Sequence, residues 1–150
     1  KEQPVVSSLP HTKIFSEQNW PFNENFKWVI SKDLLDLRQP TLKQYHQLHP
    51  SRMLRWHPIF GNGVTAVHLK TGTHQLQMTT AMLNFLLSFN HEKEVKLGKW
   101  MLDNHIDFEL MRKHVYSLVR SGLLTSSEKV LGPSHLTDDV TLQLNLEFTP

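Results

Sequence analysis

Ten histidines are the side chains of this 150-residue chain best suited to bind a metal or to move a proton near neutral pH. Their close groupings are His46-x-x-His49 and His105 with Asp107, and neither grouping has a third ligand at a recognisable spacing. We therefore expect solvated or locally hydrogen-bonded histidines, with no metal and no cofactor.

The other routes to catalysis are poorly represented. The absence of cysteine excludes disulfides, a thiol nucleophile, a Cys-ligated zinc and a protein thioester. Serine, histidine and aspartate are abundant, but no Gly-x-Ser-x-Gly elbow is present. Gly61-x-Gly63 lacks the third glycine and the following helix of a dinucleotide loop, so it is interpreted as a turn. A small enzyme would need a polar pocket that the sequence does not indicate, and we expect a non-catalytic protein.

Composition sets the broad class of protein. With 39% hydrophobic residues, the chain is long enough to bury one core or two small adjoining ones. The 16 basic and 14 acidic side chains leave a net charge of +2, so binding partners must be selected by local surfaces. No apolar run approaches the length of a membrane span. Lys1 in place of an initiator Met suggests an internal segment of a longer chain, and the lack of disulfides fits the cytoplasm or the nucleus.

Prolines mark the expected ends of the elements in the first third of the chain. Residues 1–12 lack periodicity and are predicted to be a flexible N-terminal segment. Residues 13–20 are predicted to be extended and to stop at Pro21, because the residue before a proline avoids the helical region. Pro40 is expected to interrupt the next stretch, leaving a short helix over residues 42–48.

A β-meander is predicted next. Two apolar runs, 53–60 and 64–69, flank Gly61-Asn62-Gly63, which favours a tight hairpin between them. A second turn at residues 71–73 leads to the alternating strand Gln75 to Met78. Residues 13–78 are therefore predicted to form an α/β sheet region built on a three-stranded antiparallel meander.

The remaining residues, 79–150, are predicted to form a winged helix-turn-helix unit with a closing strand. Asp107 is expected to cap the third helix at its N-terminus, and Gly122 is expected to end it. Val140 to Phe148 alternates without error, with its five apolar side chains on one face. The predicted order is helix, short helix, longer helix and two strands, over residues 80–89, 97–101, 107–121, 123–124 and 140–148. The predicted fold class is α+β, an antiparallel β-meander packed with a winged-helix unit.

Several separated blocks of this sequence resemble the cullin family, in the part that follows its helical bundle. The best match is Gln75 to Asn90, which is similar to the family's strand running into an apolar helix that closes in Phe-Asn. Leu142-x-x-Asn145-x-x-Phe148 resembles the family's Phe-x-x-Asn-x-x-Phe. Three further blocks are Phe15 to Trp20-Pro21, Met53 to Trp56 and Phe60-Gly61. The resemblance covers residues 13–149, with Phe60 and Leu142 as departures and a poor match between Trp20 and Met53.

The resemblance implies a scaffold of a cullin-RING ubiquitin ligase. In the family, a RING-box subunit adds a β-strand to the sheet of this region and brings a ubiquitin-conjugating enzyme, while a substrate adaptor binds helical repeats that are absent here. An open sheet edge is physically suited to such strand addition. The residues predicted to contact the partner are Lys13, Ile14, Phe15, Leu54, Arg55 and Trp56.

The alternative is a winged-helix domain that binds nucleic acid. Its candidate residues are Arg112, Lys113, His114 and Arg120. The charges argue against it. Residues 107–121 hold three basic and two acidic side chains, with both acids in the first turn, and residues 125–139 hold one lysine against three acids. We therefore expect a protein partner and no nucleic acid.

Overall fold

The computed structural model describes residues 13–19, 28–57 and 61–150. The chain divides into two compact units, residues 1–57 and 58–150. The predicted flexible segment 1–12 and the predicted boundary at Trp20-Pro21 lie outside the described residues. The predicted division after residue 78 falls inside the second unit, one residue before the end of a strand that leads directly into a helix.

The first unit contains a short 3₁₀ helix, η1 (Glu17–Asn19), and one long helix, α1 (Lys32–Leu48). Residues 13–16 have no regular structure, and the extended segment predicted over 13–20 is wrong at residues 17–19, which form η1. The interruption predicted at Pro40 is also wrong, because α1 continues through it. A proline inside a helix lacks one backbone donor. The helix continues on both sides, and at its end the N–H of His49 donates to the carbonyl of Tyr45 at 2.8 Å.

The first strand of the predicted meander is not formed over residues 53–57. Residues 52–57 have no regular structure, and residues 58–60 lie outside the described part of the chain. An apolar run becomes a strand only where another backbone pairs with it. Within the described residues, the next run along the chain instead pairs with the strand that follows it. The prediction for Met53 to His57 was therefore wrong.

The second unit begins with a two-stranded antiparallel hairpin of β1 (Asn62–Leu69) and β2 (Gly72–Thr79). Leu69 lies opposite Gly72, so the turn between the strands consists of Lys70 and Thr71. Gly72 has a φ of 127°, a conformation that a residue with a Cβ rarely adopts. This confirms the predicted second turn, whereas the glycines predicted to form a tight turn at 61–63 lead into β1.

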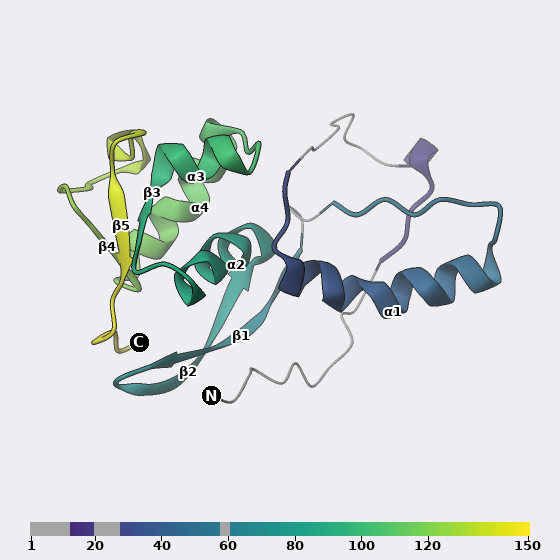
Figure 1. Ribbon diagram of the computed structural model, residues 1–150, viewed down its shortest axis with the longest axis horizontal. Helices are drawn as coiled ribbons and strands as arrows, with labels where there is room; N and C mark the ends of the chain where they lie inside the picture. The colour runs from purple at the N-terminus through teal and green to yellow at the C-terminus, as the bar shows by residue number, and fades with distance from the viewer. Residues whose placement is uncertain (1–12, 20–27, 58–60) are drawn as a thin grey trace. The chain divides into compact units, whose positions relative to one another are not determined.

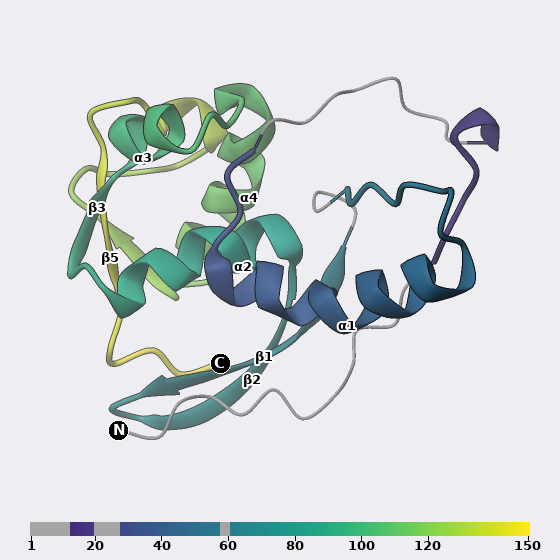
Figure 2. The ribbon, with the colours of Figure 1, turned by 45° about the vertical axis from the view of Figure 1, so that its right-hand side comes forward.

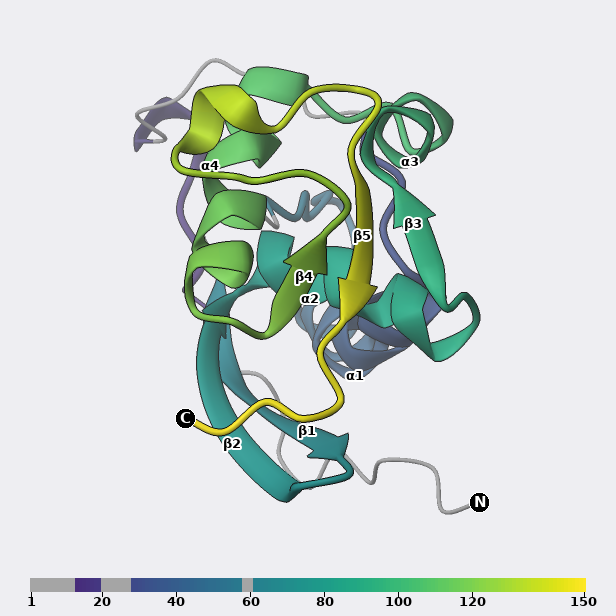
Figure 3. The same cartoon turned by 90° about the vertical axis from the view of Figure 1, so that its left-hand side faces the viewer.

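The hairpin continues directly into a helical region that packs on a small sheet (Figures 1 and 2). β2 ends at Thr79, and the following helix begins at Thr80. The three-stranded sheet has the order β3-β5-β4 with both pairs antiparallel, so β5 is central (Figure 3). The elements are α2 (Thr80–Leu86), η3 (Leu87–Asn90), β3 (Glu94–Lys96), α3 (Leu97–Asp103), α4 (Phe108–Arg120), β4 (Leu124–Ser126), η4 (Pro133–His135) and β5 (Thr141–Leu144). The predicted helices and strands follow in the predicted order, but β3 is an additional strand between the first two helices that was not predicted.

Local capping residues define these helices. The side chain of Asp107 accepts from the N–H of Leu110 at 3.0 Å, as predicted for an N-cap. Thr79 caps α2 in the same way, accepting from the N–H of Met82 at 3.2 Å. Gly122 follows α4 with a φ of 86°, as expected for the residue after a helix C-terminus. α2 and α4 therefore begin where their local sequence dictates, and α4 also ends there.

The core of the second unit lies between these helices and the three-stranded sheet. Phe85 of α2 is fully buried, and its ring meets that of Trp100 edge-on at 4.8 Å. The Trp100 Nε1–H donates to the hydroxyl of Ser88 at 2.7 Å. The side chains below 2% exposure are Ala81, Phe85, Leu97, Met111, Val115, Leu123, Leu124, Leu136, Val140 and Leu142. None of the helices in the described ranges could cross a membrane.

The strand predicted over Val140 to Phe148 is shorter than its alternation suggests. β5 ends at Leu144, and Leu146 is 43% exposed, so the five apolar side chains do not share one face. Asn145 ends the strand, because its Oδ1 accepts from the N–H of Glu147 at 3.1 Å and this bond turns the chain. The prediction was therefore wrong beyond Leu144.

Candidate partner-binding edges

The hairpin of β1 and β2 has backbone groups that point away from the pair. The N–H of Thr80 donates to the carbonyl of Gly61 at 2.8 Å, so the pair Gly61 and Thr80 is hydrogen-bonded. Hydrogen-bonded and non-hydrogen-bonded pairs alternate in an antiparallel ladder. The outward-pointing N–H and C=O groups therefore belong to Asn62, Val64, Ala66 and His68 on β1 and to Thr73, Gln75 and Gln77 on β2.

These outward groups are available to another strand. No other described residue makes a backbone hydrogen bond to them. Neither β1 nor β2 contains an Asp, Glu, Lys, Arg or Pro, the residues that natural proteins place on an edge to block pairing. The exposed side chains along β1 include Val64, which is 68% exposed. The hairpin is therefore an uncharged edge eight residues long on each strand.

The three-stranded sheet offers poorer edges. β3 and β4 have three residues each. The N–H of Leu97 donates to the carbonyl of Val140, which places the outward groups of β3 on Glu94 and Lys96, both charged and exposed. A short, charged edge disfavours pairing with another chain. Of the two sheets, the hairpin is the better candidate for strand addition.

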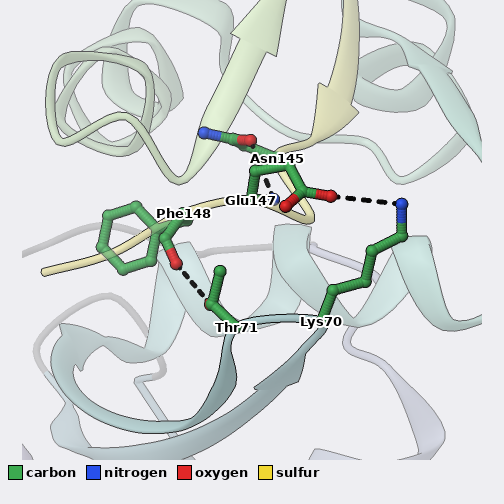
Figure 4. Close-up of polar contacts among 5 residues, drawn as sticks. All are labelled: Lys70, Thr71, Asn145, Glu147 and Phe148. Carbon is green, nitrogen blue, oxygen red and sulfur yellow. Dashed lines mark hydrogen bonds and ion pairs between the residues drawn. The ribbon is translucent and has the colours of Figure 1, made fainter.

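The hairpin is anchored at both of its ends within the second unit. At its base, the hydroxyl of Thr79 lies 3.0 Å from Nδ1 of His114 on α4. At its tip, the hydroxyl of Thr71 donates to the carbonyl of Phe148 at 2.6 Å, and Lys70 forms an ion pair with Glu147 at 3.2 Å (Figure 4). Sequence reasoning missed Thr71 and Glu147, and the signal for them was Asn145, a poor strand residue inside a perfect alternation.

The residues predicted to contact a partner lie in the first unit. Lys13, Ile14 and Phe15 are exposed and have no regular structure. Leu54 and Trp56 are half-buried, Arg55 is exposed, and none of the three lies in a strand.

The histidine that follows Trp56 has a shifted pKa. Burial, and secondarily the positive charge of Arg55, lowers the pKa of His57 from its ordinary value. The indole Nε1 of Trp56 is buried and finds no hydrogen-bond acceptor in the part of the chain that the structure describes.

The residues of the nucleic-acid alternative do not form a shared free surface. The guanidinium of Arg112 lies 4.3 Å from the centre of the Phe108 ring and forms an ion pair with Glu109 at 3.1 Å. His114 is half-buried against Thr79, and burial lowers its pKa. Lys113 and Arg120 are exposed, but they lie seven residues and roughly 10 Å apart along the helix axis. Two isolated cations are a weak basis for phosphate binding.

No metal site emerges from the histidines that the structure describes. Across residues 13–19, 28–57 and 61–150, no three His, Asp or Glu side chains gather closely enough to hold an ion. Several histidines are hydrogen-bonded locally instead. His68 pairs with Thr73 at 2.9 Å, and His74 pairs with Thr71 at 2.8 Å.

Comparison with known families identifies the chain. The family model described as the cullin alpha+beta domain matches residues 14–148, nearly the whole sequence. This chain belongs to the cullin family. It is therefore part of a cullin-type scaffold, of a family that assembles ubiquitin ligases and is generally non-catalytic.

The fold gives a physical account of the two best-matching blocks of the cullin resemblance. Gln75 to Asn90 is the segment in which β2 runs into α2 and η3, and it buries Met78 and Phe85. In Leu142-x-x-Asn145-x-x-Phe148, Leu142 is fully buried, Asn145 makes the turn and Phe148 is 7% exposed. The two apolar positions of this motif are thus buried on either side of a built-in turn.

Proposed function

We propose that this chain holds a RING-box subunit by adding one strand of that subunit to an edge of the β1–β2 hairpin. The observation that carries the proposal is the eight-residue, uncharged edge whose outward N–H and C=O groups meet no described backbone. Strand addition uses such groups for affinity and the alternate side-chain pockets for specificity.

The remainder of the second unit braces this edge. We propose that α2 to β5 form a winged helix, because helix, strand, two helices and two further strands follow in that order and β5 lies between β3 and β4. Met78 at the end of β2 is buried, and Thr79 bonds to α4. The winged helix thus gives the hairpin a rigid support.

The wider assembly follows from the cullin scaffold. In this proposal the RING-box subunit brings the ubiquitin-conjugating enzyme, and a substrate adaptor binds helical repeats outside this sequence. The transfer chemistry resides in those partners, which agrees with the absence of cysteine. The expected location is the cytoplasm, the nucleus or both.

The two segments predicted from the sequence stay candidates for the same contact. Lys13 to Phe15 and Leu54 to Trp56 lack regular structure, and Ile14 and Phe15 are 49% and 57% exposed. Segments of this kind can adopt a strand when a partner supplies the missing backbone bonds. We propose them as additional contacts of the RING-box subunit.

Binding of a purified RING-box protein to the 150-residue chain tests the proposal. We expect a complex with the intact partner and none with a partner that lacks its N-terminal strand. A well-folded chain that fails to bind the intact partner would refute the proposed function.

Proline substitution distinguishes whether the partner's strand pairs with β1 or with β2. Ala66 on β1 and Gln75 on β2 both point their N–H groups outward, so proline there removes a bond to an incoming strand and spares the bonds inside the hairpin. We expect one of Ala66→Pro and Gln75→Pro to abolish binding and the other to retain it. Retained binding in both variants would argue against strand addition to this hairpin.

A further inference from the structure

After β5 the chain leaves the strand and reaches the hairpin, although the alternation of apolar and polar residues continues to Phe148. Asn145 donates its N–H to the carbonyl of Leu123 at 2.8 Å and its side-chain amide to the carbonyl of Gly122 at 2.9 Å. Its Oδ1 accepts from the N–H of Glu147, and this turn leaves Leu146 43% exposed. Ending β5 in this way has a cost in exposed apolar surface. The segment that follows the turn contacts the hairpin.

That segment contacts the hairpin turn (Figure 4), and the ring of its Phe148 contacts His74 on β2. The carbonyl of Phe148 accepts from the hydroxyl of Thr71 at 2.6 Å. Since Thr71 has a single hydroxyl proton and a carbonyl can only accept, Thr71 Oγ1 must accept from Nε2–H of His74, which lies 2.8 Å away. One hydroxyl thus joins the chain end to both the turn and β2.

The ring of Phe148 completes the connection. It meets the ring of His74 edge-on at 5.9 Å, and a Cβ placed on Gly122 would lie 4.0 Å from its Cδ2 atom. Phe148 is 7% exposed, so it fills the space between β2 and the end of α4. We call these contacts of residues 145–148 with Thr71 and His74 the tip clasp.

A free hairpin would be a poor receptor for another strand. An isolated two-stranded hairpin is at best marginally stable in water, and ordering it during binding reduces affinity. The base of the hairpin is fixed by the buried Met78 and by Thr79, but the tip lies seven or more residues away. Among the described residues, the contacts of the tip clasp join the tip of the hairpin to the rest of the second unit.

We infer that the tip clasp positions the hairpin edge for the partner's strand, with Thr71 and Phe148 as positioning residues that do not themselves contact the partner. This inference rests on the proposed function. Its central element is the Thr71 hydroxyl. The Lys70–Glu147 ion pair contributes little, because its side chains are 66% and 71% exposed and solvent screens such pairs.

The test compares Thr71→Val, which keeps the shape and removes the hydroxyl, with Thr71→Ser, which keeps the hydroxyl. Residue-resolved amide exchange of the unbound 150-residue chain is the first measurement, and affinity for the intact RING-box protein is the second. Loss of one hydrogen bond should make Thr71→Val exchange about three- to tenfold faster at the hairpin tip and bind about three- to tenfold more weakly. Thr71→Ser and Glu147→Gln should both stay within about twofold of the wild type.

The outcomes separate the two proposals. If the wild-type chain does not bind the RING-box protein, the proposed function fails, while the exchange data still report on the clasp. If the wild type binds and Thr71→Val matches it in both measurements, the inference is overturned. If Thr71→Val accelerates exchange equally in the hairpin, α4 and β5, the clasp supports global stability and does not position the hairpin, which also overturns the inference.

Discussion

The hydroxyl of Thr79 and Nδ1 of His114 lie 3.0 Å apart and join the base of the hairpin to α4. The same oxygen accepts from the N–H of Met82 as the N-cap of α2. The hydroxyl oxygen has two lone pairs, so it can accept from Met82 and still either donate to Nδ1 or accept from it, according to the tautomer of His114. One side chain therefore joins the start of α2 to a half-buried histidine.

The burial of His114 predicts a pH dependence of stability. Burial lowers the pKa of His114 from 6.5 in the folded chain, so the unfolded chain takes up a proton more readily. The contribution of His114 to the free energy of unfolding should be complete at neutral pH. It should be lost as the pH falls below about 6.5 and level off below the folded-state pKa. Denaturant unfolding at about pH 7.5 and about pH 5.5 measures it.

Substitution of His114 measures its contribution to the pH dependence of stability. His114→Gln should reduce the loss of stability between the two pH values, because glutamine does not titrate. His91→Gln, which removes an exposed histidine of the same unit, is the matched control. Equal pH dependence in His114→Gln and the wild type would show that the burial of His114 does not contribute to the pH dependence of stability.

Gly98 predicts a steric effect in α3. A Cβ at this position would lie 2.6 Å from Cβ and 2.8 Å from the carbonyl oxygen of Asp138, so the loop before β5 would have to move. Gly98→Ala should lower the free energy of unfolding by about 1–3 kcal/mol, the usual cost of overpacking. Gly132→Ala is the control, because nothing lies within 4 Å of its added Cβ. Thermal unfolding distinguishes them, and a stabilised Gly98→Ala would show that the loop yields freely.

His105 predicts a backbone effect in the turn between α3 and α4. Its φ is 54°, in the left-handed region that β-branched residues strongly disfavour. His105→Val should therefore destabilise the fold by about 1–2 kcal/mol. His105→Asn should be neutral or slightly stabilising, since asparagine tolerates this conformation. Urea midpoints of the two variants test this, and equal midpoints would argue against strain at this turn.

The helical part of the fold was predictable because its signals are local. Asp107 and Gly122 cap α4 through bonds and a backbone angle that involve residues only a few positions away. The apolar period that predicted α2 likewise needs no distant partner to be recognised. The turn after β1 was predictable for the same reason, because a glycine marks it.

The strands were less predictable because they depend on distant partners. Alternation over Val140 to Phe148 indicates which side chains could share a face, but the pairing of β5 ends at Leu144, beside the first residues of β3 and β4. The run over Met53 to His57 has the composition of a strand, yet it has no regular structure. The partner contact predicted for Leu54 to Trp56 depends on a strand that this run does not form by itself, whereas the better candidate edge lies on the hairpin. Residues such as Thr71 act through the tertiary fold, and the sequence alone could not place them.

Asn145 gives the last prediction, on the turn that redirects the chain toward the hairpin. Asn145→Ala removes the side-chain bonds to the carbonyl of Gly122 and to the N–H of Glu147. At about 0.5–1.5 kcal/mol for each bond, the free energy of unfolding should fall by about 1–3 kcal/mol. Gln143→Ala is the matched control in β5, because its amide bonds to exposed Glu94 at 2.7 Å and its loss should change stability by less than about 0.5 kcal/mol. If both variants unfold at the same denaturant concentration, Asn145 does not lock the turn, and the exposure of Leu146 would need another cause.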